Sequence, residues 1–422
     1  MRNPYWLMQE KSHQTITLIT HKSIKFIQFI LEPSRGSFSL GVLSTSLYAL
    51  SSPLVRLHSD SNGGLLLLSR PIRIVCRAFV GVGFSPVSST STSPPPRCRL
   101  YIGFILLRHF FFSRVREAVR TPPVLHPFVS SKWGRVCQFL IEEGFIEKSN
   151  VVEPLEASMD DLLVVHSERY LEGLEISAEV AIILEVRQVG MFPNLLVQEN
   201  ALRPFRKQVG GSVLSGKLAM ERGWAINVGG GFHHCSAEQG GGFCTYADIT
   251  LCIQFAFVRL NISRVMIIDL DAHQGNGHEN DFADDERVYT LDMYNADIYP
   301  LDYEARQYIN QKVELVSGTG TEDYIAHLDK ALEVAKSNFH PELVVYNADI
   351  LEGDPLGRLE ISPEGVALRD EKVFRFAKER NIPLIMLTSG GYMKSSARVI
   401  ADSRINLSKK KLIDLGKIHS TG

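Results

Sequence analysis

The stretch Val265-Met266-Ile267-Ile268-Asp269-Leu270-Asp271-Ala272-His273 decides the fold of this chain. It opens with four consecutive apolar residues, a pattern typical of a strand that is buried on both faces of a parallel sheet. The run then ends in carboxylates and an imidazole, which are costly to bury without polar partners. Because alternate side chains of a strand point to the same face, Asp269, Asp271 and His273 should lie on one side. The stretch therefore predicts a buried strand whose carboxyl end carries chemistry.

The segments around this strand alternate between strand and helix patterns from about residue 121 onward. The expected strands cover residues 224–228, 264–270, 288–292, 343–346 and 383–388. The expected helices cover residues 131–143, 158–165, 211–222, 246–259, 322–337 and 363–380. This alternation predicts a three-layer α/β/α fold with a mostly parallel sheet. In such sheets ligands bind beyond the carboxyl ends of the strands, so functional residues should follow strands directly.

The charge of the chain divides it near residue 120. The whole sequence has 45 Lys and Arg, 47 Asp and Glu and a formal net charge of −2. Residues 1–120 hold 15 basic and four acidic residues, which leaves 30 basic and 43 acidic residues for the remainder. We expect a basic, Ser- and Arg-rich extension at 1–120 that is irregular, disordered or transit-like, then a catalytic domain at 121–410 and a tail at 411–422. The sequence predicts no membrane span and no direct nucleic-acid binding.

Polar residues of catalytic type follow the expected strands, namely His233-His234, Asp271 with His273, Asp349 and Tyr392. One imidazole and two carboxylates suit Zn²⁺, and three protein ligands leave the fourth position of a catalytic zinc open. Adjacent imidazoles beside such a site can move protons in both directions. A tyrosine phenol can donate to a developing oxyanion. Each feature alone is common, and their value lies in their order along the chain.

The other histidines and the cysteines favour structural roles. We expect His126 and His166 to be packed structural residues, and His278 to be a surface or helix residue like His327 and His340. The six cysteines form no Cys-x-x-Cys pair, which indicates reduced thiols.

Five ordered motifs resemble the zinc-dependent histone deacetylases. They are Gly-Gly-Gly-Phe-His-His (229–234), Gly-Gly-Phe-Cys-Thr-Tyr-Ala-Asp-Ile (241–249), Asp-Leu-Asp-Ala-His-Gln-Gly-Asn-Gly (269–277), Asp-Ile-Leu-Glu-Gly-Asp-Pro-Leu-Gly (349–357) and Ser-Gly-Gly-Tyr (389–392). The residues around these motifs, such as Leu-His-Pro-Phe (125–128), most resemble class IV, the histone deacetylase 11-like branch. Within that branch they suggest a plant member or a splice variant. The resemblance runs from about residue 121 to about residue 407 and implies the arginase/deacetylase-like fold.

The resemblance implies a role for each matched residue. Zn²⁺ would be held by Asp271, His273 and Asp349, and a structural K⁺ would lie near Asp269. The proton-transfer set would be His234 as general base for a metal-bound water, His233 as its assistant oriented by Asp269, and Asn276 behind His234. Tyr392 would stabilise the oxyanion, and the acyl-lysine channel would be lined by Gly242, Phe243, Gly391 and Leu356. Because an amide is a weaker proton acceptor than a carboxylate, Asn276 predicts a less basic His234.

Two segments depart from the family pattern. In the family, the strand that leads to the third metal ligand has the sequence Tyr-Asn-Ala-Gly-Thr-Asp. In this chain Asp349 follows Tyr346-Asn347-Ala348 directly, so two residues are missing. Two residues of strand span about 6.6 Å, and a period of two preserves the face of Asp349 but not its reach. The opening strand of the family has no counterpart that can be aligned in residues 103–120.

Three functions follow from these observations. The leading hypothesis is zinc-dependent hydrolysis of N6-acyl-lysine, acetylated or long-chain fatty-acylated, on histones or other proteins. The second is a catalytically impaired splice variant that acts as a binding or decoy module, because two residues are missing before Asp349. The third is a small-molecule amidohydrolase of the acetylpolyamine or ureohydrolase type. Binuclear arginase-like sites require an Asp at the position of Gly275, which argues against a second metal here. We expect corepressor-type partners, and a location in the nucleus or cytoplasm, or in a plastid or mitochondrion if residues 1–100 form a transit peptide.

Overall fold

The computed structural model describes residues 14–20, 23–31, 38–41, 132–148, 151–349, 351–388 and 390–414. The chain divides into two units, Met1–Ile74 and Val75–Gly422. In the first unit, β1 (Gln14–Thr20), β2 (Ser23–Leu31) and β3 (Phe38–Gly41) form an antiparallel sheet in that order. These strands lie in the segment for which the sequence predicts an irregular extension, and the rest of that prediction lies outside the described residues.

A six-stranded sheet forms the centre of the second unit. Its strands are β4 (Trp224–Asn227), β5 (Val265–Asp269), β6 (Val288–Asn295), β7 (Gln311–Leu315), β8 (Leu343–Asn347) and β9 (Leu384–Leu387). They are arranged in the order β4-β9-β8-β5-β6-β7, and every neighbouring pair is parallel. The carboxyl ends of all six strands therefore meet at one edge of the sheet. This arrangement confirms the predicted three-layer α/β/α class and places the polar residues that follow the strands together.

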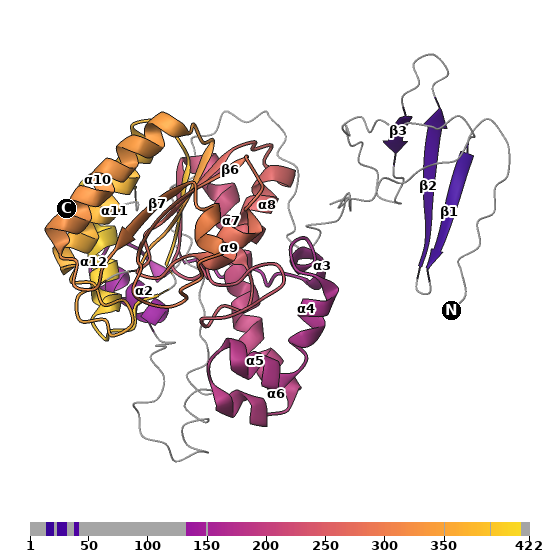
Figure 1. The fold of residues 1–422 in the computed structure, drawn as a ribbon, viewed down its shortest axis with the longest axis horizontal. Coiled ribbons are helices and arrows are strands. Elements are labelled where there is room, and N and C mark those ends of the chain that lie inside the picture. The colour runs from indigo at the N-terminus through magenta and orange to yellow at the C-terminus, as the bar shows by residue number, and fades with distance from the viewer. Residues whose placement is uncertain are drawn as a thin grey trace. The chain divides into compact units, whose positions relative to one another are not determined.

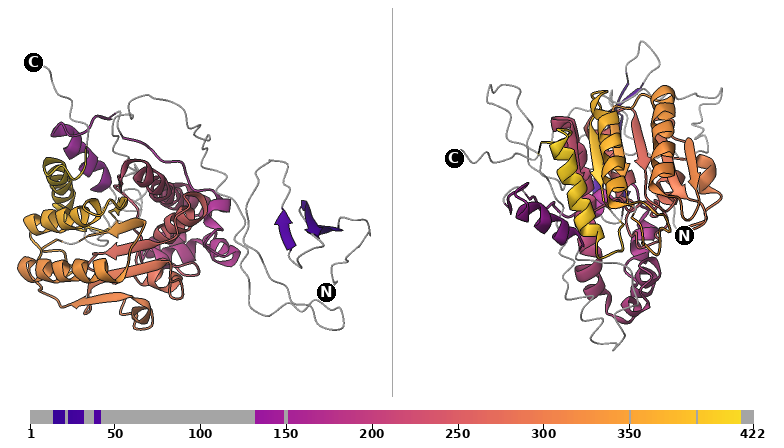
Figure 2. Two further views of the ribbon diagram at one scale, coloured as in Figure 1. Left: turned by 90° about the horizontal axis from the view of Figure 1, so that it is seen from above. Right: turned by 90° about the vertical axis from the view of Figure 1, so that its left-hand side faces the viewer.

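Helices cover both faces of this sheet (Figure 1, Figure 2). On one side lie α10 (Thr321–Asn338), α11 (Pro363–Lys378) and α12 (Ser396–Lys409), with α2 (Lys132–Glu142) packed against α12. On the other lie α7 (Arg203–Arg222) and α8 (Asp248–Arg259). The remaining elements are α3 (Met159–Leu162), α4 (Glu168–Gly173), α5 (Ser177–Ile183), η2 (Arg187–Met191), α6 (Asn194–Val197), η3 (Gln198–Leu202), α9 (Asn276–Asp281) and η4 (Ala305–Tyr308).

Alternation along each central strand explains the layers. In β5, Met266 and Ile268 pack in one hydrophobic core, whereas Val265 and Ile267 pack in the other. All five residues of β5 are buried, as are all five of β8. A strand with no solvent-facing side must be apolar throughout, which is why these segments read as continuous apolar runs. Among the described helices, none is long and apolar enough to cross a bilayer.

Several elements of the second unit were not predicted from the sequence, among them α4, α5, α6, β7, α9 and α12. The edge strand β7 reads Gln-Lys-Val-Glu-Leu, and only its last residue is buried, so it lacks the apolar run of the central strands. The short α9 is built from Asn276-Gly277-His278-Glu279-Asn280-Asp281, which has no apolar stripe. The long α12 was also not predicted, because its buried face mixes Ser403 and Arg404 with the apolar residues.

Candidate metal and proton-transfer site

The loop after β4 carries the two adjacent imidazoles and is held by a buried aspartate. Asp248, the first residue of α8, accepts hydrogen bonds from the backbone amides of Gly231 and Phe232, each at 2.8 Å. Gly230 and Gly231 have positive φ angles, and a Cβ on Gly230 would overlap Ser212 and Asp248. Only glycine allows the backbone this left-handed turn and close approach. The loop thereby delivers His233 and His234 to the carboxyl edge of the sheet.

His233 forms a tight pair with Asp269, as the sequence predicts. Its Nδ1 lies 2.8 Å from Asp269 Oδ2, and both side chains are buried. Burial lowers the pKa of His233, but the carboxylates of Asp269 and Asp271 overcome it and raise this pKa to about 9. The pKa of Asp269 is lowered despite burial, because His233 and His278 stabilise its charge. The raised pKa favours the protonated form of His233, and its Nδ1 donates to Asp269.

His234 is oriented by Asn276 in a chain of defined direction. Asn276 Nδ2 donates to Asp302 Oδ2 at 3.1 Å, so its Oδ1 faces His234 Nδ1 at 2.9 Å. Because an amide oxygen can only accept, His234 Nδ1 is the donor and its Nε2 carries the lone pair. Burial, together with His233 and His273, lowers the pKa of His234 well below its usual value. The Asn276 hydrogen bond acts in the opposite direction, so burial and the neighbouring imidazoles keep His234 neutral.

Asp271, His273 and Asp349 line one cavity together with Tyr392. His273 Nδ1 lies 3.1 Å from Asp271 Oδ1. Two atoms that each lie about 2.0–2.1 Å from one tetrahedral zinc are separated by a little over 3 Å, so this pair has the spacing of two ligands. The donor set, one imidazole and two carboxylates on a shared cavity, fits zinc in kind.

Asp349 reaches this cavity by a shortened route. It follows β8 after a single residue, and its carbonyl oxygen accepts a hydrogen bond from Ala272 N at 3.1 Å. Its carboxylate lies against the loop after β9, where a Cβ on Gly390 would overlap it. Burial raises the pKa of Asp349 to about 8, although the ammonium of buried Lys132 opposes this shift. Asp349 therefore lines the same cavity as the other two expected ligands, and its carboxylate lies close to Gly390.

One group of three metal-type side chains comes closer together than the expected set. Across the described residues, His233, Asp269 and His278 are the group whose ligand atoms all lie within 4.8 Å of one another. The set of Asp271, His273 and Asp349 is not brought within that spacing. We attribute this difference to the two residues missing before Asp349, which would lengthen the connection to Asp271 and His273 after β5 by about 6.6 Å.

Tyr392 lines the cavity, and the expected channel residues contact residues at or near it. The Tyr392 backbone amide donates to Asp354 Oδ2 at 3.0 Å, which fixes the segment after β9. Burial and the nearby carboxylates raise the pKa of Tyr392 well above its usual value, so its phenol stays protonated. The rings of Phe243 and Tyr392 lie 6.0 Å apart, and a Cβ on Gly242 would press on the His234 ring. Gly391 lies beside Asp349, whereas Leu356 N donates to Asp354 Oδ1 at 2.9 Å.

The other histidines of the described residues lie where the sequence predicts them. His166 is buried, with Nδ1 3.0 Å from Ala237 O and Nε2 accepting from Ala247 N, so it is the packed structural residue that the sequence predicts. His327 is exposed on α10. His278 lies on α9, so the helical one of its two predicted positions, surface or helix, is confirmed; its side chain is 1% exposed and bonded to Asp269. His126 lies outside the described residues.

Sequence reasoning missed four residues that hold the site, namely Lys132, Asp248, Asp302 and Asp354. Two had a usable signal: Asp248 opens a helix within the second family-like motif, and Asp354 precedes a proline in the fourth. Lys132 stands on a helix far from the motifs, and its buried ammonium could not be foreseen from its spacing.

Comparisons with known proteins agree with this geometry. The family model of the histone deacetylase domain matches residues 126–407. Histone deacetylase 2 of Arabidopsis thaliana is 71% identical over 291 residues, which cover 68% of this chain and 75% of that protein. Histone deacetylase 8 of Xenopus tropicalis is 27% identical over 265 residues, covering 59% of this chain and 70% of the relative. The crystal structure of the HDA15 HD domain superimposes with a TM-score of 0.59 at 19% identity, covering 77% of this chain and 92% of that one.

These matches correct one expectation and establish another. The expected class IV, histone deacetylase 11-like branch is wrong, because the relative that shares 71% of its residues over this domain is Histone deacetylase 2. The expectation of class IV rested on short motifs such as Leu-His-Pro-Phe (125–128), which lie outside the described residues. The domain match covers most of the chain and includes every motif described above. The chain therefore belongs to the histone deacetylase family of enzymes.

Proposed function

We propose that this enzyme hydrolyses the amide bond of N6-acyl-lysine in histones or other proteins, with zinc as its cofactor. One observation carries the proposal. Two adjacent imidazoles, His233 paired with Asp269 and His234 paired with Asn276, lie beside the cavity that holds Asp271, His273, Asp349 and Tyr392. Amide hydrolysis requires a base for water, an acid for the leaving amine and a donor for the oxyanion.

His234 supplies the base in this proposal. A zinc ion held by Asp271, His273 and Asp349 would polarise the acyl carbonyl and acidify water. The neutral His234 directs its Nδ1 proton to Asn276, which leaves Nε2 free to take the proton of the attacking water. The lowered pKa of His234 keeps this lone pair available at neutral pH.

His233 and Tyr392 complete the proton and charge balance. The imidazolium of His233 keeps its Nδ1 proton on Asp269, so its Nε2 proton is the one that can pass to the leaving lysine amine. Tyr392 stays protonated and can donate its phenolic hydrogen to the oxyanion. Gly242 and Phe243 would flank the lysine stem.

The structural K⁺ belongs to the same proposal. Asp292 pairs with Asp269 in the register of β5 and β6 and is fully buried. Among the described residues, nothing hydrogen-bonds its Oδ1. Burial and the charges of Asp269 and Glu279 raise the pKa of Asp292 well above its usual value, and a cation beside Asp269 would stabilise the ionised form.

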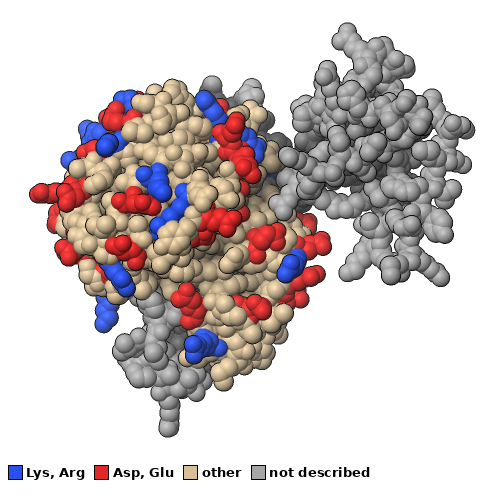
Figure 3. Space-filling model, viewed as in Figure 1, with Lys and Arg blue, Asp and Glu red and all other residues tan. Residues whose placement is uncertain are grey.

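Protein substrates such as histones, and corepressor-type partners, also remain proposals. Acidic side chains lie among basic ones on the face that Figure 3 shows, which supports a protein substrate in preference to nucleic acid. We also propose a nuclear or cytoplasmic location. A location in a plastid or mitochondrion would require residues 1–100 to act as a transit peptide.

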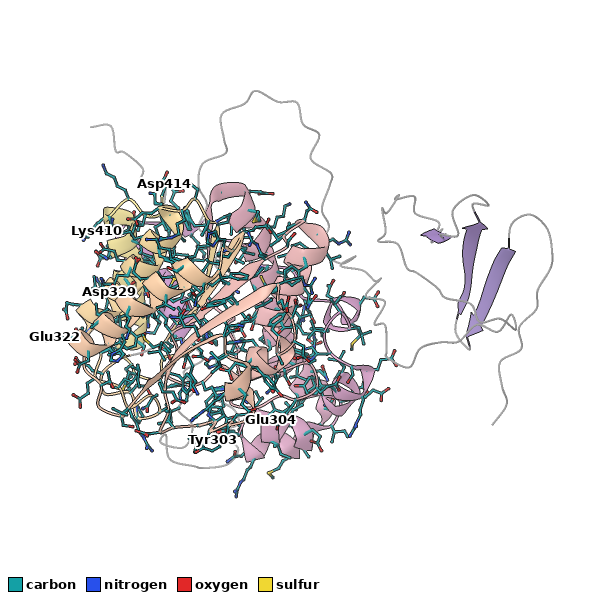
Figure 4. All side chains as sticks on the ribbon, turned by 45° about the horizontal axis from the view of Figure 1, so that its top comes forward. Tyr303, Glu304, Glu322, Asp329, Lys410 and Asp414 are labelled. Atoms are coloured by element: carbon teal, nitrogen blue, oxygen red, sulfur yellow. The ribbon has the colours of Figure 1, made fainter. Side chains whose placement is uncertain are left out.

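The test is hydrolysis of acetyl-lysine and myristoyl-lysine peptides by the zinc-loaded full chain. Tyr392→Phe should lower kcat by about 10²–10³-fold, the usual cost of one oxyanion donor. Tyr303→Phe is the matched control, because Tyr303 is 68% exposed at the edge of the molecule (Figure 4). A wild-type chain that binds no zinc and cleaves neither peptide would sink the proposal.

A second function, a binding or decoy module, is favoured by one observation. The ligand atoms of Asp271, His273 and Asp349 do not converge within 4.8 Å. If the wild-type chain binds acyl-lysine peptide without cleaving it, and cleavage appears when Gly-Thr is inserted before Asp349, the decoy function is the correct one.

A further inference from the structure

Asp269 receives two imidazoles on a single carboxylate oxygen. His233 Nδ1 lies 2.8 Å from Asp269 Oδ2, and His278 Nε2 lies 2.9 Å from the same atom. The three side chains are between 0% and 4% exposed. His278 therefore touches the residue that orients His233, although it stands outside the acyl-lysine cavity.

The other oxygen of Asp269 is also committed. Oδ1 accepts from Asn347 Nδ2 at 3.1 Å and from Asp271 N at 3.2 Å. A carboxylate offers about four acceptor positions, so these four donors fill it. With Asn347 on β8 and His278 on α9, the carboxylate cannot rotate without breaking bonds to separate elements. Removal of His278 would free one position on the oxygen that holds His233.

The short helix α9 serves both imidazoles of the tandem pair. Asn276 contacts His234 directly, and His278 contacts His233 through Asp269. Gly277 lies between them, and its amide donates to His233 O at 2.8 Å. A Cβ on Gly277 would overlap the backbone of Cys235, so glycine lets α9 pack directly on the histidine loop.

Gly275 makes room for the His278 imidazole. A Cβ at this position would overlap His278 Nε2 and lie 2.7 Å from Asp269 Oδ2. The hydrogen bond between His278 and Asp269 therefore depends on a glycine at 275. Within the described residues, His278 Nδ1 has no hydrogen-bond partner. A buried N–H without an acceptor is costly, so the proton of His278 belongs on Nε2, where Asp269 accepts it.

We propose that His278 is a positioning residue: through Asp269 it fixes the orientation of His233, while Asn276 on the same helix fixes that of His234. The proposal rests on the proposed deacylase function for its kinetic consequence, but not for its structural one. It assigns to α9 the alignment of both proton-transfer groups relative to the cavity.

Two substitutions separate positioning from packing. His278→Gln places an amide N–H near the position of Nε2, whereas His278→Leu fills similar space with no donor. We expect His278→Leu to lower kcat for acetyl-lysine hydrolysis by about tenfold or more with KM nearly unchanged, and His278→Gln to restore most of it. His327→Gln, a change at the exposed histidine of α10, is the matched control.

A spectroscopic arm makes the result independent of activity. In full-length protein labelled with ¹⁵N-histidine, the hydrogen-bonded Nδ1 proton of His233 should give a low-field signal. This signal should persist in His278→Gln and shift or broaden in His278→Leu. If the wild type is inactive but the His233 signal behaves in this way, the deacylase function is contradicted and the positioning role of His278 is supported. Retention of both the signal and kcat in His278→Leu would overturn the role, as would equal losses in the two variants. Loss of bound zinc in His278→Gln would also overturn it, because His233, Asp269 and His278 would then be a metal site.

Discussion

Insertion of Gly-Thr between Ala348 and Asp349 should tighten zinc binding. The inserted pair lengthens the connection by about 6.6 Å and keeps the side-chain face of Asp349, because strand side chains alternate with a period of two. In the present chain the Asp349 carboxylate leans on Gly390, while Asp271 Oδ1 and His273 Nδ1 already lie 3.1 Å apart. The insertion should therefore allow the Asp349 carboxylate to approach Asp271 and His273.

The expected gain is large because a third ligand is added. Loss of a partner that merely supports a metal ligand costs about 10–100-fold in affinity, so gain of a ligand should bring at least about 100-fold. Competition with a chromophoric chelator measures the zinc Kd of both full-length proteins. A Gly-Thr insertion after Gly318, whose added Cβ would meet no neighbour within 4 Å, controls for insertion itself. Equal zinc affinity with and without the insertion before Asp349 would refute the argument about reach.

Three further predictions use groups in or near the site. Asn276→Asp should raise the pKa of His234 and move the acid limb of the kcat/KM–pH profile to higher pH, and an unmoved limb would disprove it. Burial lowers the pKa of His166 from 6.5 to about 4, so the unfolded chain binds this proton first as pH falls. The free energy of unfolding should therefore fall by about 3 kcal/mol between pH 6.5 and 4, and urea titrations should show a smaller fall in His166→Gln. Lys132→Met should destabilise the fold by about 3–5 kcal/mol, since it leaves the buried carboxylates of the cavity uncompensated, whereas surface Lys207→Met should cost under about 1 kcal/mol in the same titration.

The central layers of the fold were predictable because both faces of the sheet are buried. The strands β5, β8 and β9 consist of apolar residues apart from Asp269 and Asn347 at the carboxyl ends of β5 and β8. The edge strand β7 has one buried residue, so the same physics leaves no apolar run to find. The short helix α9 is stabilised by contacts with the histidine loop and not by its own pattern.

The site was predictable only as far as its residues follow strands. His233 lies beside Asp269 because the parallel strands β4 and β5 end at one edge, whereas Asp271 and His273 are two residues apart after the same strand. The positions of Lys132 and His278 depend on how α2 and α9 pack against that edge, which spacing along the chain does not encode. The branch within the family was predicted wrongly from short motifs, and the 71% identity over 291 residues to Histone deacetylase 2 corrects it.

The most direct test of the central claim follows zinc and hydrolysis in one titration. The full-length chain is stripped with a chelator, and zinc is returned stepwise while bound zinc and cleavage of acetyl-lysine and myristoyl-lysine peptides are measured together. The account predicts that cleavage of one of these peptides rises in proportion to bound zinc and saturates at one zinc per chain, and that Asp271→Asn loses both. Cleavage that is complete before zinc is added, or full zinc binding with neither peptide cleaved, would contradict it.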